Sequence, residues 1–289
     1  MTVRHVDSTA NPLVKELAGL KQRRARERSG TFLVEGVREA RRALAAGVRP
    51  RLLVTSPALL EASLARELSA QAIAAGAELV TFGEAAFRRV SLREHPDGAL
   101  LLAETRRLTP AQVSLGPGAL SLVLVGLEKP GNVGALLRSA DAVGVDAVFL
   151  CPDVLEAGAP GGEVVAGAGR SAAVGVDLES PNVVRAAMGS SFALPVGVGS
   201  ADQVVAALRA AEAKLVATAP GAARRHWDAD LRGGVALILG REHDGLSPWW
   251  SARVDETIGL PMRAEAADSL NVSVAGAVLL YEALRQRTG

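Results

Sequence analysis

The sequence predicts an α/β protein with two domains, over residues 1–107 and 118–289. Short apolar runs typical of strands alternate with segments whose apolar residues recur at helical spacing, and this alternation predicts helices layered on sheets. A polar stretch with proline and glycine, residues 105–118, interrupts the alternation and predicts a linker. The length of 289 residues, of which 49% are hydrophobic, is sufficient for two hydrophobic cores.

The first predicted domain opens with a helix from Pro12 to Ser29. Asn11 suits the N-cap of this helix, Pro12 suits its first turn, and Gly30 suits the position after its last turn. The other expected elements follow in alternation. They are strands at 31–34, 51–55 and 78–81, helices at 38–46 and 58–75, and an apolar run at 99–103.

The second predicted domain repeats the alternation. Residues 235–239 read Val-Ala-Leu-Ile-Leu, which is typical of a strand buried on both faces of a parallel sheet. The Gly/Ala-rich segment 158–175 belongs to no expected element. The other expected strands lie at 121–126, 147–151, 192–196, 214–218 and 258–260, and the helices at 134–143, 202–213 and 271–287.

The composition excludes several classes of protein. The longest apolar runs, such as Leu120–Leu127, fall well short of the ~20 residues of a membrane span. Cys151 is the only cysteine, which excludes an internal disulfide. The hydrophobic fraction excludes a disordered chain, and the first residues lack the apolar segment of a secretory signal. We therefore expect a globular cytoplasmic protein.

Residues 21–28 form a basic cluster with five positive charges against one negative charge, although the whole chain has a formal net charge of only +1. Most of these cations are arginines, whose planar guanidinium suits phosphate. The cluster has two interpretations. It is either a solvated helix face or a surface that contacts a phosphate backbone, whose affinity falls as salt rises. Charge alone does not separate them.

Other kinds of site have weaker support. The glycines of Gly167–Ala172 match a dinucleotide-binding pattern, but no helix is expected after them. Gly197-Val-Gly199 lacks the third glycine of that pattern, and no P-loop sequence is present. The four histidines do not have zinc-ligand spacing, so no metal site is predicted. Cys151 ends an expected strand and is interpreted as a small buried residue rather than a nucleophile.

Three segments of the second domain place glycines and polar residues directly after apolar strands. Asn132 lies where a loop enters a helix that carries Arg138, and Glu242 lies in a glycine loop. Taken singly, each segment is an ordinary strand-to-loop connection. The segments read Glu128-Lys-Pro-Gly-Asn-Val-Gly-Ala-Leu-Leu-Arg-Ser-Ala140, Leu239-Gly-Arg-Glu-His-Asp-Gly-Leu246, and Ile258-Gly-Leu-Pro-Met262 followed by Ser269-Leu-Asn-Val-Ser-Val274.

Together and in this order, the three segments resemble the motifs of the SpoU (TrmH-type) RNA ribose 2′-O-methyltransferases of the SPOUT superfamily. Residues 181–190 are similar to the family's segment between the first two motifs, although Ala187 stands where serine is commoner. Residues 11–36 resemble the substrate-binding domain often attached in this family. The overall pattern is similar to the thiostrepton-resistance methylase branch. The segment 158–175 is longer than the family pattern leads us to expect.

The resemblance implies a second domain with a deep trefoil knot, an exception to the usual absence of knots, preceded by a small L30e-like α/β domain. It implies methylation of a ribose 2′-hydroxyl by S-adenosylmethionine, with 23S rRNA the favoured substrate and tRNA the alternative. It also implies a homodimer, for which Val274, Val278, Tyr281 and Leu284 offer an apolar stripe. A non-catalytic RNA-binding protein is less favoured, because the motif residues are all present.

The resemblance also assigns roles to residues of this chain. The expected catalytic residues are Asn132, Arg138, Glu242, Ser269 and Asn271. The expected cofactor-binding residues are Leu239, Gly240, Ile258, Leu260, Met262, Leu270 and Asn271. The expected RNA-binding residues are Arg23, Arg24, Arg26, Arg28, Arg41 and Arg185. Arg138 would activate the ribose hydroxyl, but an arginine stays protonated in proteins. Its guanidinium would then hold a phosphate and stabilise a developing alkoxide, with phosphate or water accepting the proton, and the sequence leaves these accounts open.

Overall fold

The computed structural model describes residues 3–154, 176–242, 244–263 and 269–289. The chain forms two compact units, and the first comprises residues 1–106 together with 177–193. The second comprises residues 107–176 and 194–289. The first change of unit lies next to the predicted linker. Residues 177–193 were expected in the second domain, but their contacts lie within the first unit.

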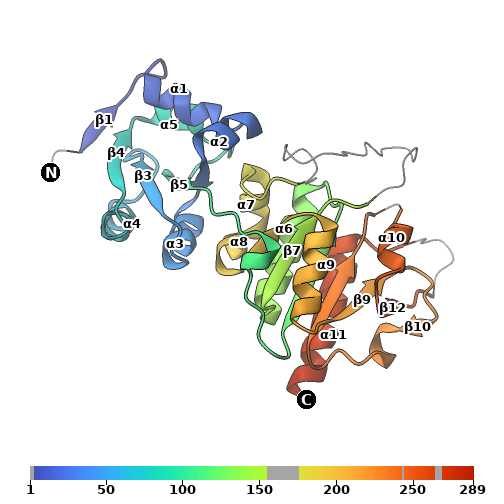
Figure 1. The fold of residues 1–289 in the computed structure, drawn as a ribbon. Helices are drawn as coiled ribbons and strands as arrows, with labels where there is room; N and C mark the ends of the chain where they lie inside the picture. Colours follow the sequence, from blue (N-terminus) through green and yellow to red (C-terminus); the bar gives the residue numbers. More distant parts are fainter. Residues whose placement is uncertain (1–2, 155–175, 243, 264–268) are drawn as a thin grey trace. The chain divides into compact units, whose positions relative to one another are not determined.

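The first unit is built on a mixed sheet with helices packed on it (Figure 1). Within the described residues the strand order is β1-β4-β3-β5-β2, in which β1, β4 and β3 run parallel and β5 runs antiparallel to both its neighbours. The strands are β1 (Arg4–Val6), β2 (Thr31–Glu35), β3 (Pro50–Thr55), β4 (Glu78–Phe82) and β5 (Ala99–Glu104). The helices are α1 (Pro12–Gly19), α2 (Arg23–Ser29), α3 (Val37–Ala45), α4 (Ala62–Ala74), α5 (Glu84–Val90), α7 (Pro181–Ala187) and α8 (Ser190–Ala193).

The two faces of this sheet have separate cores. Along β5, Leu100 and Leu102 belong to the core that contains residues of α1 and α5, whereas Leu101 belongs to the core that contains residues of α3 and α4. This division follows from the two-residue period of a strand. The second core also contains Val184 of α7, and the Phe192 ring of α8 lies 6.1 Å from the Phe32 ring. These contacts make residues 177–193 part of the first unit.

Two sequence predictions for this unit are wrong in detail. The helix expected from Pro12 to Ser29 is two helices, because the backbone at Leu20 and Lys21 leaves the helical path and its carbonyls accept hydrogen bonds from Arg26 at 2.6 and 2.9 Å. The strand expected at residues 192–196 is also displaced. Phe192 belongs to α8, where it packs on Phe32, and the strand begins only at Val196.

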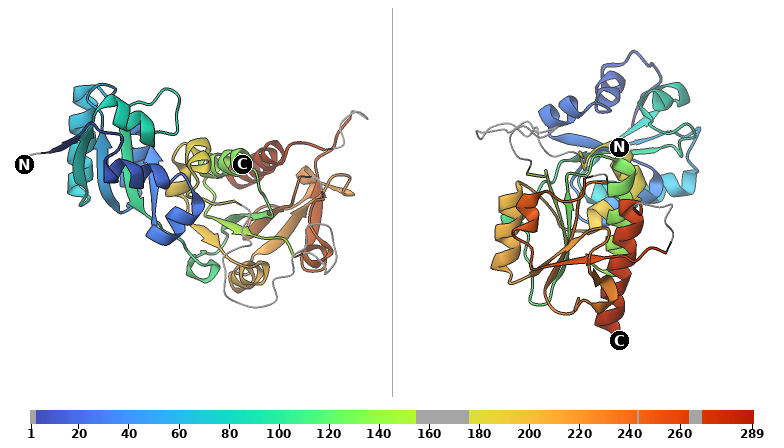
Figure 2. Two further views of the ribbon diagram at one scale, coloured as in Figure 1. Left: turned by 90° about the horizontal axis from the view of Figure 1, so that it is seen from above. Right: turned by 90° about the vertical axis from the view of Figure 1, so that its right-hand side faces the viewer.

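The second unit contains a parallel sheet between two layers of helices, seen edge-on in the right panel of Figure 2. Within the described residues its strand order is β10-β12-β9-β11-β6-β7-β8. Helices α6 and α11 pack together on one face, and α9 and α10 contribute to the core of the other. The strands are β6 (Leu120–Val125), β7 (Ala147–Cys151), β8 (Val196–Val198), β9 (Lys214–Thr218), β10 (Arg224–Arg225), β11 (Val235–Leu239) and β12 (Glu256–Gly259). The helices are α6 (Pro130–Val143), α9 (Ala201–Ala210), α10 (Pro248–Ser251) and α11 (Val272–Thr288), with 3₁₀ turns η1 (Pro110–Gln112) and η2 (His226–Asp228).

The prediction of a fully buried strand at residues 235–239 is confirmed. All five residues of β11 are buried, and the strand lies between β9 and β6, parallel to both. The α/β fold class is confirmed with it. None of the helices in the described ranges is both long and apolar enough to cross a bilayer. The Gly/Ala-rich segment 158–175, with its Gly167–Ala172 pattern, lies outside the described residues.

Candidate active site

A cavity of about 790 Å³ lies at the carboxyl ends of three neighbouring strands of the second unit, β9, β11 and β12. Ligands of open parallel sheets bind at this edge, because the loops that leave the strands gather there. Thr218 at the end of β9, Leu239 at the end of β11 and Ile258 in β12 all line the cavity. The N-terminal residues of α11 close another side.

The walls of the cavity combine apolar and polar residues. They include six of the seven residues expected to bind the cofactor, which are Leu239, Gly240, Ile258, Leu260, Met262 and Leu270. Leu239 and Ile258 are buried, whereas Met262 and Leu270 are 37% and 42% exposed. The inner end of the cavity is therefore lined by buried residues, and its rim is exposed to solvent. The seventh residue, Asn271, does not line it.

Gly240 allows the loop after β11 to fold back on itself. A Cβ atom at this position would lie 2.7 Å from the backbone nitrogen of Leu246, which no side chain tolerates. The loop is closed by reciprocal backbone hydrogen bonds between Arg241 and Gly245, at 2.9 and 3.1 Å. The glycine that sequence analysis placed in this loop is thus required by close backbone packing.

Glu242 is the centre of a polar network at the edge of the cavity. One carboxylate oxygen accepts a hydrogen bond from the side-chain amide of Asn132, and the other accepts from the ammonium of Lys129. Asn271 in turn donates to the side-chain oxygen of Asn132 at 3.3 Å. The Glu242 side chain is 19% exposed, so its charge is partly shielded from water and balanced by Lys129. Three residues expected at the catalytic site are therefore neighbours.

Asn271 also has a structural task, because it is the N-cap of α11. Its side-chain oxygen accepts from the backbone nitrogen of Ser273 at 2.9 Å and from the Ser273 hydroxyl at 2.6 Å. This cap fixes the amide group, whose nitrogen then points to Asn132. Ser269, two residues earlier, is exposed and lines the cavity.

Arg138 is not brought to the cavity. It is an exposed residue of α6, six positions after Asn132, and it is absent from the residues that line the cavity. Six residues of an α-helix correspond to a rotation of about 600°, so Arg138 lies about 120° around the helix from Asn132 and ~9 Å along it. Asn132 does not line the cavity either, so the part of Arg138 in the reaction stays a prediction.

Sequence reasoning missed Lys129 and the strand end at residues 217–220. Lys129 directly precedes Pro130 and pairs with a residue more than a hundred positions away, so no local pattern indicated it. Residues 217–220 line the cavity because β9 is the neighbour of β11, and the carboxyl-end rule for parallel strands would have found them. Cys151 is buried, and burial raises the pKa of its thiol to about 12, in agreement with the structural interpretation.

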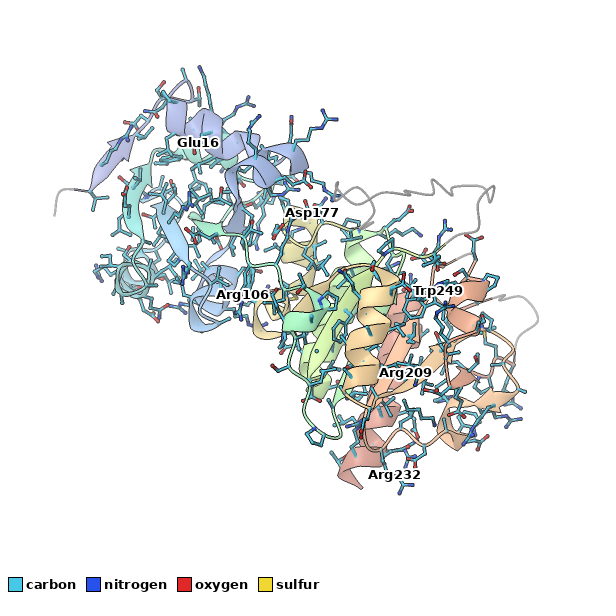
Figure 3. All side chains as sticks on the ribbon, in the orientation of Figure 1. Glu16, Arg106, Asp177, Arg209, Arg232 and Trp249 are labelled. Carbon is cyan, nitrogen blue, oxygen red and sulfur yellow. The ribbon has the colours of Figure 1, made fainter. Side chains whose placement is uncertain are left out.

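The basic cluster in the first unit contains one residue that the sequence analysis misjudged. Arg26 is only 3% exposed and pairs at 2.5 Å with Asp177, which is labelled in Figure 3. Because its guanidinium is buried and bound to two carbonyls and a carboxylate, Arg26 cannot contact RNA. The prediction that it binds RNA is therefore wrong.

The other arginines expected to bind RNA lie at or near the surface. Arg24, Arg28 and Arg185 are exposed, and Arg185 donates a long hydrogen bond to the side-chain oxygen of Asn182 at 3.5 Å. Arg23 pairs with Glu27 at 2.8 Å, and Arg41 pairs with Glu67. Surface pairs of this kind are weak enough to be exchanged for a phosphate.

Two family models match the chain. The model of the SpoU rRNA methylase family matches residues 165–281, a range that holds the second and third motif segments and leaves out the first. The model of the MRM3-like substrate binding domain matches residues 11–101.

Individual relatives cover nearly the whole chain. The 23S rRNA (uridine(2479)-2′-O)-methyltransferase of Streptomyces viridochromogenes is 32% identical over 93% of this chain and 87% of its own length. A crystal structure of an RNA 2′-O ribose methyltransferase is 39% identical, with 98% of each chain covered and a TM-score of 0.77. The AdoMet-bound rRNA methyltransferase from Sinorhizobium meliloti is 25% identical, with 99% of each chain covered and a TM-score of 0.83.

Proposed function

The chain belongs to the SpoU family of rRNA methylases, and from this membership we propose that it transfers a methyl group from S-adenosylmethionine to a ribose 2′-hydroxyl of 23S rRNA. One observation carries the proposal. A cavity with apolar and polar walls, at the carboxyl ends of parallel strands, ends at a network of Glu242, Asn132 and Asn271, which supplies a carboxylate and two amides beside a space for a ligand.

The cavity fits S-adenosylmethionine in size and in chemistry. Its volume of about 790 Å³ lies within the range of pockets that bury a small cofactor. Leu239, Ile258 and Leu260 would contact the adenine ring, and the backbone of Gly240, where a Cβ has no room, would approach the ligand closely. When bound, the cofactor supplies an activated methyl group on its sulfonium sulfur.

The polar network would orient the reacting ribose. Glu242 is held by two donors, so its carboxylate has a fixed direction before any substrate arrives. Arg138 stays protonated and so serves as a phosphate ligand and as a stabiliser of negative charge on the ribose oxygen, rather than as a base. Because Arg138 does not line the cavity, the RNA would have to reach across α6 to contact both groups.

The remaining expectations from family membership belong to the same proposal. A homodimer through α11 is supported by Val274, Val278 and Tyr281, which are 50%, 40% and 54% exposed at helical spacing. The trefoil knot, the L30e-like character of the first domain and the cytoplasmic location stay predictions. The first unit would supply phosphate contacts through its exposed arginines. The assignments of Ser269 and Asn271 to the reaction also stay predictions.

Methyl transfer to RNA tests the function directly. The protein is incubated with radiolabelled S-adenosylmethionine and in vitro transcribed 23S rRNA or tRNA, and the methylated nucleotide is mapped. We expect label in 23S rRNA at a ribose, and no transfer when the target nucleotide carries a 2′-deoxyribose. Label in tRNA alone would replace the substrate, label on the deoxy substrate would mean that a base is modified, and absence of transfer would favour a non-catalytic RNA-binding protein.

A further inference from the structure

The edge of the second unit's sheet carries an exposed tryptophan beside an arginine. Trp227 in η2 is 45% exposed, and the guanidinium of Arg225 lies 5.6 Å from the centre of its ring. The other two tryptophans differ from it. Trp250 is fully buried, and Trp249 is half-buried under Arg253, whose guanidinium lies 3.9 Å from its ring. Trp227 is therefore the tryptophan whose ring is most open to a ligand.

The turn that carries Trp227 is held in place from several sides. The guanidinium of Arg224 donates to the backbone oxygen of Asp228 at 2.7 Å and pairs with Glu256 at 2.6 Å. Gln286 of α11 donates to the backbone oxygen of Ala229 at 3.0 Å. The ring of His226, itself buried, meets the Trp227 ring edge-on at 4.6 Å. The indole is therefore presented to solvent by a fixed backbone, which lowers the entropy lost when a ligand stacks on it.

The position of this surface connects it to the cofactor cavity. Strand β10 is the edge strand and pairs in parallel with β12, so that Arg224 lies opposite Ile258 and Arg225 opposite Gly259. Ile258 lines the cavity. Neighbouring strands are about 4.8 Å apart, so β10 lies beside the wall of the cavity that β12 forms.

We propose that Arg225 and Trp227 form a stacking site for an unpaired base of the substrate RNA, on the flank of the cavity. Unpaired bases of RNA are bound by stacking on aromatic rings, commonly beside an arginine. Among the described residues, the Arg225 guanidinium has no hydrogen-bonding or carboxylate partner, unlike that of Arg224. The proposal rests on the proposed function, because it needs RNA at the cavity.

Charge near the ring indicates that stacking outweighs attraction to phosphate. Asp228 follows Trp227 on the same turn and is exposed, and it offsets part of the positive charge of Arg225. The paired Arg232, labelled in Figure 3, bonds Asp230 at 2.9 Å. Loss of the indole should therefore weaken RNA binding without changing its salt dependence, which reports phosphate contacts.

The test compares Trp227→Leu and Trp227→Phe with the wild type and with a matched control, Arg232→Gln. The probe is in vitro transcribed 23S rRNA, and the readouts are the KM for RNA, the slope of affinity against salt, and the Kd for S-adenosylmethionine. We expect Trp227→Leu to raise the KM for RNA roughly 5- to 150-fold, the loss of one stacked base, with the salt slope and cofactor Kd unchanged. Trp227→Phe should retain most of the affinity, and Arg232→Gln should behave as the wild type.

A second measurement uses the wild-type protein and does not depend on a variant that folds. A single-stranded oligoadenylate of about 12 nucleotides should quench part of the tryptophan fluorescence, whereas a duplex of the same length should not. Trp227→Phe should lose this quenching, because the two other tryptophans are covered.

The outcomes separate the two proposals. If the wild type methylates the RNA and Trp227→Leu does so with the same KM, the stacking site is refuted and the proposed function stands. If the wild type transfers no methyl group to RNA, the proposed function fails and the site has no substrate RNA to hold. Quenching by oligoadenylate that Trp227→Phe abolishes would then still show a base-stacking surface, and absence of quenching would refute that surface as well. If Trp227→Leu instead changes the molecular mass in light scattering with no change in RNA affinity, the surface is a protein interface and the stacking site is refuted.

Discussion

Gly276→Ala tests how closely α11 packs against α6 and how that packing shapes the cofactor cavity. A Cβ atom at Gly276 would overlap the Cδ2 methyl of Leu136 and would lie 2.8 Å from the Cδ1 methyl of Leu239. Carbon atoms in contact prefer about 3.5–4.0 Å, so both leucines must move. Leu136 is fully buried and has no space to turn into, whereas Leu239, 1% exposed, lines the cavity and can be displaced toward it.

The expected magnitude is the balance of two opposed effects. Alanine is favoured over glycine in a helix by about 1 kcal/mol. Forcing extra atoms into a packed core costs about 1–3 kcal/mol, and the upper end applies because two buried side chains are displaced. The free energy of unfolding should therefore fall by about 2 kcal/mol, which corresponds to a fall in Tm of about 4–8 °C for a unit of this size. Leu239 lines the cavity, so its displacement should also weaken binding of S-adenosylmethionine.

Urea unfolding gives the stability change, and calorimetry gives the Kd for S-adenosylmethionine. The matched control is Gly19→Ala near the end of α1, where a Cβ would have no atom within 4 Å, and this change should be neutral or stabilising. Gly276→Ala as stable as the wild type would refute the packing argument. A destabilised Gly276→Ala with an unchanged Kd for S-adenosylmethionine would refute the inference that displacement of Leu239 weakens cofactor binding.

Three further predictions concern other parts of the chain. Arg26→Ala should lower the free energy of unfolding by about 3–5 kcal/mol in urea denaturation, because it leaves Asp177 buried without its partner, while Arg26→Met combined with Asp177→Leu should regain most of the loss. Arg138→Ala should leave the Kd for S-adenosylmethionine unchanged, because Arg138 does not line the cavity, and should reduce the turnover of RNA methylation about 10²–10³-fold, with little rescue by lysine. The Arg285 guanidinium lowers the pKa of Glu282 from 4.5 to about 2, so this carboxylate stabilises the fold above about pH 4.5 and loses that effect as the pH falls through 2. Arg285→Ala should therefore raise the pH at which acid unfolding, followed by circular dichroism, begins.

The parts of the fold that sequence predicted well are those specified by local signals. The buried strand 235–239 is apolar at every position, and Pro130 begins α6 at its first turn, where a proline is tolerated. Gly240 lies where the loop after β11 folds back so closely that a Cβ atom has no room, and a glycine in the sequence indicates such a position. By contrast, β1 has three residues and pairs with β4 more than seventy positions later, so nothing within the segment itself indicated a strand.

The candidate site was predicted with similar limits. Asn132, Glu242 and the apolar cavity residues come together because each follows a strand of one parallel sheet, a regularity that sequence order reveals. Lys129 was missed because its role depends on a partner, Glu242, that only the folded chain supplies. Arg138 was grouped with Asn132 from family membership, although a spacing of six residues places two side chains on different sides of a helix. The role of Arg138 therefore stays a prediction from family membership.

The burial of Arg26 and the placement of residues 177–193 have a common cause. A run of arginines and a segment beginning Asp-Leu-Glu are each polar, and neither pattern shows that one residue of each forms a buried pair. Two apolar contacts of the same segment also lie in the first unit, because Val184 belongs to the core beside α3 and Phe192 packs against Phe32. The chain therefore returns to the first unit after it has begun the second. A division at residue 107 would then leave Arg26 without its carboxylate and remove two apolar side chains from the first core. The core of the first unit is built from two separate stretches of the chain. A single boundary chosen from composition therefore assigns part of that core to the other domain.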